Sequence, residues 1–265
     1  MAVTLQVKEN KPPRIVIYGV EGVGKSTFGD LAPNPIFLPT EDGLASIDSP
    51  AMPLATTFKQ FMGNIEELCT EDHDYQTAVI DSLDWLETLI HKQVAEEKGE
   101  TSIEDIGYGK GYLFALDLWA EYIEAINYLR NEKNMIIVQV AHSEIKRFEN
   151  PETDAYDRYN IKMHKKASEK IREHADLVLF ANYYVGITKE ESGFKKDGRK
   201  RAVGGKERVL YTTERPAATA KSRYNLPEEI IFDKEGDYWN VIAAGIPFLS
   251  NETKTKTKTK TEKEA

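Results

Sequence analysis

A glycine-rich stretch near the start of the chain constrains the fold more than any other feature. The segment Gly19-Val20-Glu21-Gly22-Val23-Gly24-Lys25-Ser26-Thr27 matches the pattern G-x-x-x-x-G-K-[ST] in full. It follows a β-rich run, Arg14–Tyr18, and leads into a helix expected from Lys25 to about Leu31. A strand, a glycine-rich turn and a helix in this order are typical of a phosphate-binding loop, so residues 19–27 are called the phosphate loop below.

The residue types in the phosphate loop suit a nucleoside triphosphate. Gly19, Gly22 and Gly24 let backbone N–H groups curl around phosphates without Cβ clashes, and the helix start adds its positive dipole. Lys25 reaches the β- and γ-phosphates as a point charge, and Ser26 offers a hydroxyl to Mg²⁺. We therefore expect this loop to bind ATP and Mg²⁺. The alternative is a glycine-rich turn with an ordinary surface lysine.

A carboxylate that could share the metal follows further along the chain. Asp81 ends an apolar run, Gln76–Asp81, where the acid of a Walker B strand is expected. Such an acid holds Mg²⁺, usually through the water shell of the ion. The alternative is a structural role, because Asp81 and Ser82 precede a predicted helix and could cap it.

Composition indicates a soluble globular protein. The chain has 265 residues, of which 40% are apolar and 30% charged, enough for one large or two small domains. No apolar run reaches the roughly 18 residues of a membrane-spanning helix, and the first residues lack the apolar centre of a signal peptide. The single cysteine, Cys69, and five scattered histidines exclude a disulfide framework and zinc-type spacing. We expect a cytoplasmic protein (in the host cytoplasm if phage-encoded) with no membrane partner.

The charge is acidic, which limits how nucleic acid could bind. The net charge is −9, and the segment Lys254–Ala265 holds five lysines and two glutamates, so residues 1–253 carry −12. An acidic body is not a general nucleic-acid binder, and any such binding must come from local basic patches.

Strand-like and helix-like segments alternate up to about Ala175, which predicts a parallel sheet covered by helices. The expected strands are Arg14–Tyr18, Ile36–Leu38, Gln76–Asp81 and Met135–Ala141, and the expected helices cover Phe58–Leu68, Leu83–Val94 and Leu116–Arg130. After Ala175, short strand-like runs follow at Leu177–Phe180, Tyr183–Thr188, Arg208–Thr213 and Tyr238–Val241. The predicted class is α/β, a P-loop NTPase with a mainly parallel sheet and an antiparallel C-terminal extension.

The chain is expected to form one domain over residues 1–250, followed by a tail over residues 251–265. The tail contains the repeat Lys254-Thr255-Lys256-Thr257-Lys258-Thr259-Lys260-Thr261, which has no apolar residue to bury. We predict that it is disordered. It would act as a solubilising tail or make weak electrostatic contact with nucleic acid.

Three segments after the phosphate loop resemble motifs of the RecA-like ATPases, in particular the RadA-type and phage single-strand-annealing members. Phe37–Leu44 places Glu41 at the end of the next strand, Val79–Leu83 resembles the Walker B strand, and Ile136–His142 resembles the strand that ends in a γ-phosphate sensor. The resemblance implies that Glu41 polarises the attacking water and that His142 senses the γ-phosphate. The alternatives are an acidic surface turn, in which Asp42 is a rival for the role of Glu41, and a histidine that caps a strand end.

A fourth segment, Ala220–Leu226, is similar to the RadA signature K-N-R-F-G. It keeps the two cations, Lys221 and Arg223, but Ser222, Tyr224 and Asn225 replace the family residues. The resemblance implies that both cations act on the ATP of a neighbouring subunit, with ordinary surface charge as the alternative. The resemblance spans Pro13 to Ile242, and Tyr108–Tyr112 also looks like an element of the phage group.

Two segments are locally basic. Lys195–Arg208 carries seven cations against two acids and contains three glycines, so its backbone could follow a strand of phosphates. Lys162–Arg172 carries five cations on a predicted helix after the sensor strand, and the resemblance implies a DNA-contacting loop there. For both segments a solvated basic surface is the alternative.

These observations together predict a RecA-like, Mg²⁺-dependent ATPase that forms a homo-oligomer with ATP at the subunit interface. It would bind single-stranded DNA in phage recombination or annealing. One alternative is a nucleotide-dependent interaction switch with slow hydrolysis and no role on DNA. Another is a P-loop small-molecule kinase, which is disfavoured because the chain lacks an arginine-rich lid.

Overall fold

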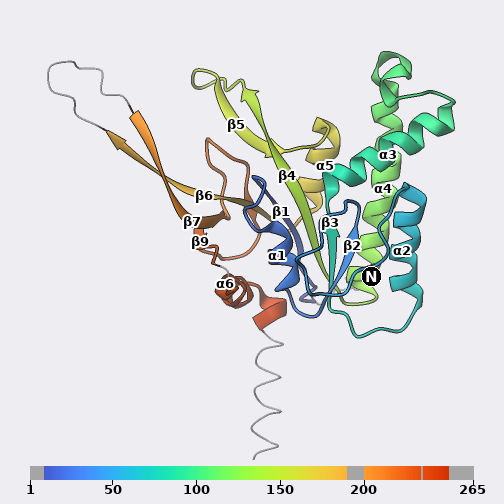
Figure 1. Ribbon diagram of the computed structural model, residues 1–265, viewed down its shortest axis with the longest axis horizontal. Helices are drawn as coiled ribbons and strands as arrows, with labels where there is room; N and C mark the ends of the chain where they lie inside the picture. The colour runs from blue at the N-terminus through green and yellow to red at the C-terminus, as the bar shows by residue number, and fades with distance from the viewer. Residues whose placement is uncertain (1–8, 190–199, 234, 251–265) are drawn as a thin grey trace, which may run out of the picture.

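A single mixed sheet runs through the computed structural model, which describes residues 9–189, 200–233 and 235–250 (Figure 1). Its strand order is β2-β3-β4-β1-β6-β7-β9, with β5 paired to β4 and β8 paired to β6. The strands are β1 (Arg14–Gly19), β2 (Pro35–Pro39), β3 (Thr77–Asp81), β4 (Ile136–Phe148), β5 (Tyr156–Ile161), β6 (Leu177–Lys189), β7 (Lys200–Tyr211), β8 (Lys221–Ser222) and β9 (Glu229–Ile231).

The sheet has a parallel half and an antiparallel half. Strands β2, β3, β4, β1 and β6 are paired in parallel, whereas β7, β8 and β9 are paired antiparallel to their neighbours. This confirms the predicted class, a mainly parallel sheet flanked by helices with an antiparallel C-terminal extension.

Helices cover both faces of the parallel half, which explains why its strands are apolar on both sides. On β1, Val16 and Tyr18 belong to the core formed with α2, α3, α4 and α5. Ile15 and Ile17 face the opposite core, which includes Phe28 of α1 and Trp239 of α6. The helices are α1 (Lys25–Asp30), α2 (Phe58–Thr70), α3 (Leu83–Lys98), α4 (Lys110–Asn131), α5 (Lys165–His174) and α6 (Asp237–Gly245), with short 3₁₀ turns η1 (Ile103–Asp105) and η2 (Gly107–Gly109).

The position of β4 between β1 and β3 determines where the functional groups lie. In the parallel register Gly19 pairs with His142, and Asp81 pairs with Val140 on one side and Pro39 on the other. The carboxyl ends of β1, β2 and β3 therefore meet at one edge of the sheet, which β4 reaches at Val140–His142. This edge is where ligands bind in open α/β sheets.

The structure corrects several predicted element bounds. Tyr238–Val241, predicted as a strand, lies in helix α6, where Tyr238, Trp239 and Ile242 are buried. This pattern fits one face of a helix that begins after Gly236. The prediction was wrong because it interpreted this short apolar run as a strand, whereas its buried residues follow the 3.6-residue period of a helix. Leu177–Phe180 and Tyr183–Thr188, predicted as two strands, form the single long strand β6.

The segment after Ala141 also differs from the prediction. Strand β4 continues past Ala141 to Phe148 and pairs with β5, so an antiparallel hairpin precedes α5. The helix predicted over Lys162–Arg172 begins at Lys165. Beyond His142 the strand β4 is mostly polar, with only Ile145 and Phe148 apolar, and its pairing with β5 identifies this part as a strand.

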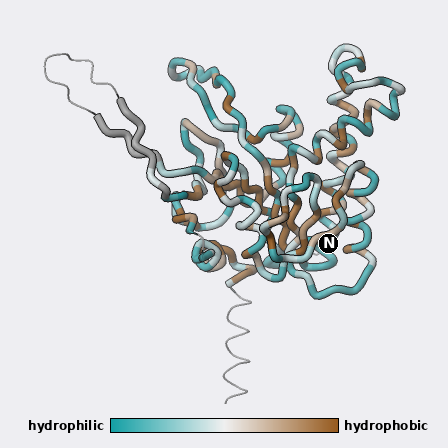
Figure 2. Tube along the Cα trace, viewed as in Figure 1, coloured by the Kyte–Doolittle hydropathy of each residue, from teal (hydrophilic) through white to brown (hydrophobic). Residues whose placement is uncertain are grey.

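Apolar residues concentrate in the central strands, and polar residues predominate at the outer end of the β4–β5 hairpin (Figure 2). Over the described residues, no helix combines the length and apolar character needed to cross a membrane. The predicted tail, residues 251–265, lies outside the described residues.

Candidate active site

The phosphate loop connects β1 to α1 and curls at the carboxyl edge of the sheet. Gly22 and Gly24 have φ angles of +70° and +104°, which L-residues with a side chain rarely adopt. These two positions therefore require glycine for the backbone to turn. The loop follows the buried strand β1 and precedes α1, as the sequence motif predicts.

The Lys25 ammonium lies inside the loop. Its side chain is buried, with only 6% of the residue exposed, and Nζ donates to the carbonyl oxygens of Gly19 (3.2 Å) and Val20 (3.0 Å). Burial lowers the pKa of Lys25, while the nearby carboxylates of Asp81 and Asp84 oppose this shift. A buried cation whose partners are neutral carbonyls is well placed to exchange them for anionic phosphate oxygens.

Ser26 and Asp81 form the donor set expected for Mg²⁺. Ser26 Oγ donates to Asp81 Oδ2 at 2.6 Å, although the two residues come from different elements, α1 and β3. Burial raises the pKa of Asp81, and the hydrogen bond from Ser26 opposes this effect. A hydroxyl and a carboxylate in contact are hard oxygen ligands of the kind that Mg²⁺ prefers. These residues fit the metal that the motif implies.

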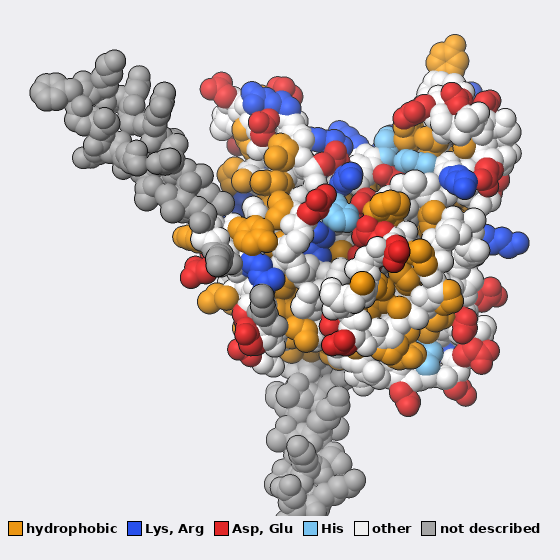
Figure 3. Space-filling view, in the orientation of Figure 1, with side chains coloured by type: hydrophobic (Ala, Val, Ile, Leu, Met, Phe, Trp, Pro, Cys, Tyr) orange, Lys and Arg blue, Asp and Glu red, His pale blue; other side chains and the backbone are white. Residues whose placement is uncertain are grey.

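Glu41 and His142 line the same cavity as the phosphate loop. The cavity has a volume of about 260 Å³, and Lys25, Ser26 and Asp81 also line it. It opens on a face where acidic, basic and histidine side chains gather between two raised flanks (Figure 3). Burial raises the pKa of Glu41, which His142 counteracts. The residues assigned to the ATP site from different parts of the sequence therefore converge, except for Lys221 and Arg223.

A further carboxylate, Asp84, holds His142. The backbone N–H of His142 donates to Asp84 Oδ1 at 3.0 Å, and His142 Nδ1 is hydrogen-bonded to Asp84 Oδ2 at 3.0 Å. The hydrogen bond with Asp84 raises the pKa of His142. Burial alone would raise the pKa of Asp84, but its bonds to His142 lower it. Since Nδ1 is engaged, Nε2 is the ring nitrogen available to a ligand.

The sequence analysis missed Asp84. In the sequence it looks like an ordinary acid in the first turn of a helix, which is favourable there for electrostatic reasons. The available signal was its position on the helix that follows Asp81, near the expected end of the sensor strand. Only the placement of β4 beside β3 brings the histidine within reach.

Residues 11–224 of the chain match the model of a protein family described as an AAA domain. The chain belongs to this AAA-domain family. Among solved structures, the chain is similar to the crystal structure of the RadB recombinase, with 12% sequence identity and a TM-score of 0.47. The match covers 85% of this chain and 90% of that chain. No curated protein matches the chain. The family match, together with the complete phosphate loop, makes the AAA-domain protein a P-loop ATPase in class.

The two cations assigned to a neighbour's ATP lie away from the cavity of this subunit. Strand β8 pairs with the beginning of β6, at the edge of the sheet opposite the phosphate loop. Lys221 Nζ donates to the carbonyl oxygens of Arg172, Glu173 and Ala175, and Arg223 donates to Asp176. These contacts provide both side chains with structural partners within the subunit. Their role in a second subunit's site stays a prediction.

The two basic segments of the AAA-domain protein differ in what the structure describes. In Lys195–Arg208, residues 195–199 lie outside the described residues, and residues 200–208 belong to β7. In Lys162–Arg172, Lys162, Lys165 and Lys166 are exposed. The other two cations contact the body of the protein: Lys170 Nζ donates to Leu116 O and Arg172 donates to Thr219. The exposed part of the second segment is therefore its first half.

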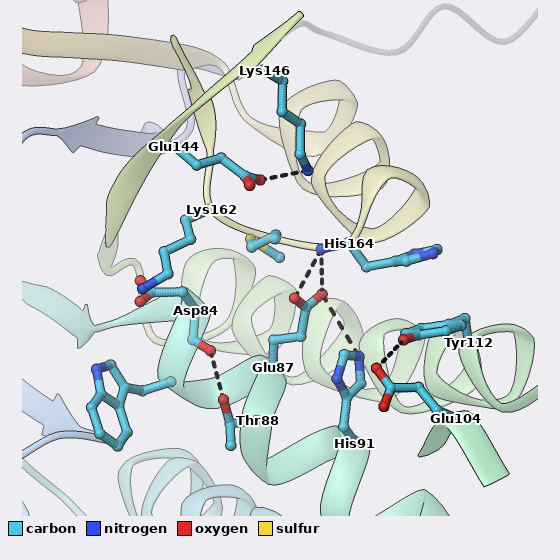
Figure 4. Close-up of a pocket in the computed structure, with 12 residues that line it drawn as sticks. Asp84, Glu87, Thr88, His91, Glu104, Tyr112, Glu144, Lys146, Lys162 and His164 are labelled. Carbon is cyan, nitrogen blue, oxygen red and sulfur yellow. Dashed lines mark hydrogen bonds and ion pairs between the residues drawn. The ribbon is translucent and has the colours of Figure 1, made fainter. Parts of the chain in front are cut away.

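A second cleft, of about 620 Å³, lies where this segment begins (Figure 4). Residues of α3 and of the segment before α5 line this cleft. The Glu87 carboxylate of α3 accepts hydrogen bonds of 2.8 and 3.1 Å from the backbone N–H of His164, which connects α3 to the start of α5. The ring of Tyr112 stacks on the ring of His164, with centroids 4.3 Å apart. Helix α3 thus carries Asp84, which is hydrogen-bonded to His142, and Glu87, which holds the beginning of α5.

Glu87 gives the protein a specific pH dependence. Burial raises the pKa of Glu87 to about 7 from its usual value near 4.5. Between these two pH values the folded state binds more protons than the unfolded state, so this residue lowers stability progressively as the pH rises. The difference corresponds to at most about 3 kcal/mol. We expect Glu87→Gln to raise the melting temperature at pH 8 and to change it little at pH 5.

Thermal unfolding of the Glu87→Gln protein at both pH values checks this expectation. Glu96→Gln is the matched control, since Glu96 lies on the same helix with its side chain 60% exposed beside Lys92. An equal shift at pH 5 and pH 8 would mean that the effect comes from the amide and not from the charge.

Proposed function

We propose that this protein is an Mg²⁺-dependent ATPase that assembles into a homo-oligomer and binds single-stranded DNA, in phage recombination or annealing. The observation that carries the ATPase part is the convergence of five predicted site residues from four separate segments on one cavity: Lys25, Ser26, Glu41, Asp81 and His142. Such a cavity, with a buried cation, a metal donor pair and an additional carboxylate, has the parts that phosphoryl transfer to water requires.

The roles of the residues follow from their chemistry and position. The backbone N–H groups of the phosphate loop and the Lys25 ammonium bind the phosphates, and Ser26 and Asp81 hold the metal. When bound, Mg²⁺ neutralises charge on the phosphate oxygens and helps to orient them. Glu41 orients a water molecule and accepts its proton, which its raised pKa favours.

His142 acts as the sensor of the γ-phosphate in this proposal. Asp84 fixes the ring through Nδ1, so Nε2 can donate to a phosphate oxygen without reorganisation of the side chain. The raised pKa of His142 favours the protonated form, which adds positive charge near the transferred group. Asp84 is therefore a positioning residue, since it acts through His142 and does not line the cavity of the phosphate loop.

Binding of single-stranded DNA is supported by local charge. The chain is acidic overall, but Lys162, Lys165 and Lys166 are exposed together on the segment that Glu87 attaches to α3. Phosphate contacts supply most of the affinity in sequence-independent binding. The second support is the basic composition of Lys195–Arg208, of which residues 200–208 lie on β7. The antiparallel pair of strands β6 and β7 is called the β6–β7 hairpin below.

One experiment separates this function from its alternatives. ATP hydrolysis is measured with and without single-stranded DNA, and DNA should stimulate it. Hydrolysis near zero in both conditions, with ATP bound, would favour the nucleotide-dependent interaction switch. Transfer of the phosphoryl group to an added metabolite would favour a small-molecule kinase.

The role of Glu41 can be tested directly. Glu41→Gln keeps the size of the side chain but removes its ability to accept a proton, so we expect normal ATP binding and hydrolysis slowed by about 10²-fold or more. Asp42→Asn is the matched control, because Asp42 is the exposed neighbour. If hydrolysis persists in Glu41→Gln and stops in Asp42→Asn, the neighbouring acid is the one that orients the water.

A further inference from the structure

The phosphate loop is attached to the β6–β7 hairpin by its outward-facing carbonyl groups. A loop that turns its N–H groups toward a phosphate must point its carbonyl groups away, and these need donors of their own. The carbonyls of Gly19 and Val20 accept from Lys25 within the motif. The next two contacts come from distant residues: Tyr183 Oη donates to Gly22 O at 3.3 Å, and Arg208 Nη1 donates to Val23 O at 3.0 Å.

The two donors form a cross-strand pair. Tyr183 of β6 lies directly opposite Arg208 of β7 in the antiparallel register, and the register shifts immediately after this pair, between Tyr183 and Val185. A β-bulge bends a strand and redirects the side chains beside it. The irregularity at this point is therefore consistent with a hairpin whose base is shaped to present two donors to the loop.

The Arg208 side chain is fixed in place. Its guanidinium lies over the ring of Phe232, 5.1 Å from the centroid, and Phe232 is buried in the core beside α1. It also lies against Gly24, where an added Cβ would come within 2.7 Å of Nη1. The third glycine of the motif thus leaves space for this arginine, in addition to providing a positive φ angle.

We propose that Tyr183 and Arg208 are positioning residues that hold the phosphate loop in its nucleotide-binding conformation before the nucleotide arrives. The Lys25 contacts must break when the ammonium turns to a phosphate, but carbonyls on the outer side of the loop can keep their donors. Ordering the loop in advance removes part of the entropy cost of binding, so it raises nucleotide affinity without touching the nucleotide. This inference rests on the proposed nucleotide site. It assigns Arg208 to the phosphate loop and not to DNA binding, although Arg208 lies in the predicted DNA-binding segment.

The test measures nucleotide affinity in the absence of DNA. Tyr183→Phe removes one hydroxyl, and we expect the Kd for both ATP and ADP to rise about fivefold to tenfold, as for loss of one hydrogen bond. Arg208→Ala should raise both values further, and Arg208→Lys should recover part of the affinity because the ammonium can still donate. The turnover number at saturating ATP should change less than twofold, since the contacts are the same in the ground and transition states.

Matched controls separate positioning from general destabilisation. Tyr184→Phe alters the adjacent exposed tyrosine, and Arg215→Gln alters an arginine that is paired with Glu229, away from the loop. Neither should change nucleotide affinity. Hydrogen exchange of the peptide that contains residues 19–27 should be faster in Tyr183→Phe and Arg208→Ala without nucleotide, while exchange in β3 and β4 stays unchanged.

Two results would overturn the proposal. The first is wild-type affinity for ATP and ADP in both Tyr183→Phe and Arg208→Ala. The second is wild-type nucleotide affinity in Arg208→Ala with loss of DNA stimulation, which would return Arg208 to a DNA-contacting role. By contrast, a wild-type protein that binds ATP but does not respond to DNA contradicts the proposed DNA function and leaves the positioning role standing.

Discussion

Replacing Lys25 by alanine is expected to abolish ATP binding or turnover while the fold stays intact. The ammonium is the buried cation of the loop, and its neighbours there are backbone carbonyls and the carboxylates of Asp81 and Asp84. Without it, the negative charge of the phosphates would meet those carboxylates with one compensating positive charge fewer. Burial disfavours the charged form of Lys25 and lowers its pKa, so we expect that removal of this charge leaves the protein folded.

The measurement is ATP binding and hydrolysis by the Lys25→Ala protein, with the melting temperature as the check on folding. Lys59→Ala is the control, because Lys59 is an exposed lysine on α2. Unchanged turnover in Lys25→Ala would contradict the assignment of the loop as the nucleotide site. This holds for the ATPase and for the alternative small-molecule kinase.

The second large effect is expected from Arg223→Ala. If this arginine reaches the ATP of a neighbouring subunit, turnover should fall by about 10³-fold, as for other arginines that act in trans, and ATP affinity should barely change. Within the subunit Arg223 shares Asp176 with Arg14 and Arg130. The Arg223 side chain is 51% exposed, whereas those of Arg14 and Arg130 are 14% and 15% exposed. Arg223 can therefore leave Asp176 without leaving that carboxylate unpaired.

Mixing two inactive proteins tests the shared site. In a mixed assembly of Arg223→Ala and Lys25→Ala, some interfaces combine an intact phosphate loop with an intact Arg223, so part of the activity should return. Lys221 is a poor substitute for this test, since its ammonium holds three carbonyls at the end of α5. No recovery of activity, together with a protein that stays monomeric with ATP and DNA, would rule out a site between subunits.

The local motifs were predictable because each depends on residues that are close in sequence. The phosphate loop needs only a strand, three glycines and a helix, and the structure places these as expected. The parallel half of the sheet could be predicted from continuous apolar runs, because strands that are buried on both faces carry few polar residues. Helix α6 was missed for a related reason: a short run of large apolar residues fits a strand or a buried helix equally well.

The sequence by itself determined which chemical groups the candidate site contains, namely Lys25, Ser26, Glu41, Asp81 and His142. The tertiary structure decided which of them meet, because the order of the strands places β4 between β1 and β3. It also decided the contacts that no local pattern encodes: Asp84 on His142, and Tyr183 and Arg208 on the outer carbonyls of the loop. The physical reason is distance along the chain. Hydrogen bonds depend on distances and angles of a few ångströms and degrees, and between distant residues only the completed packing of the sheet fixes these.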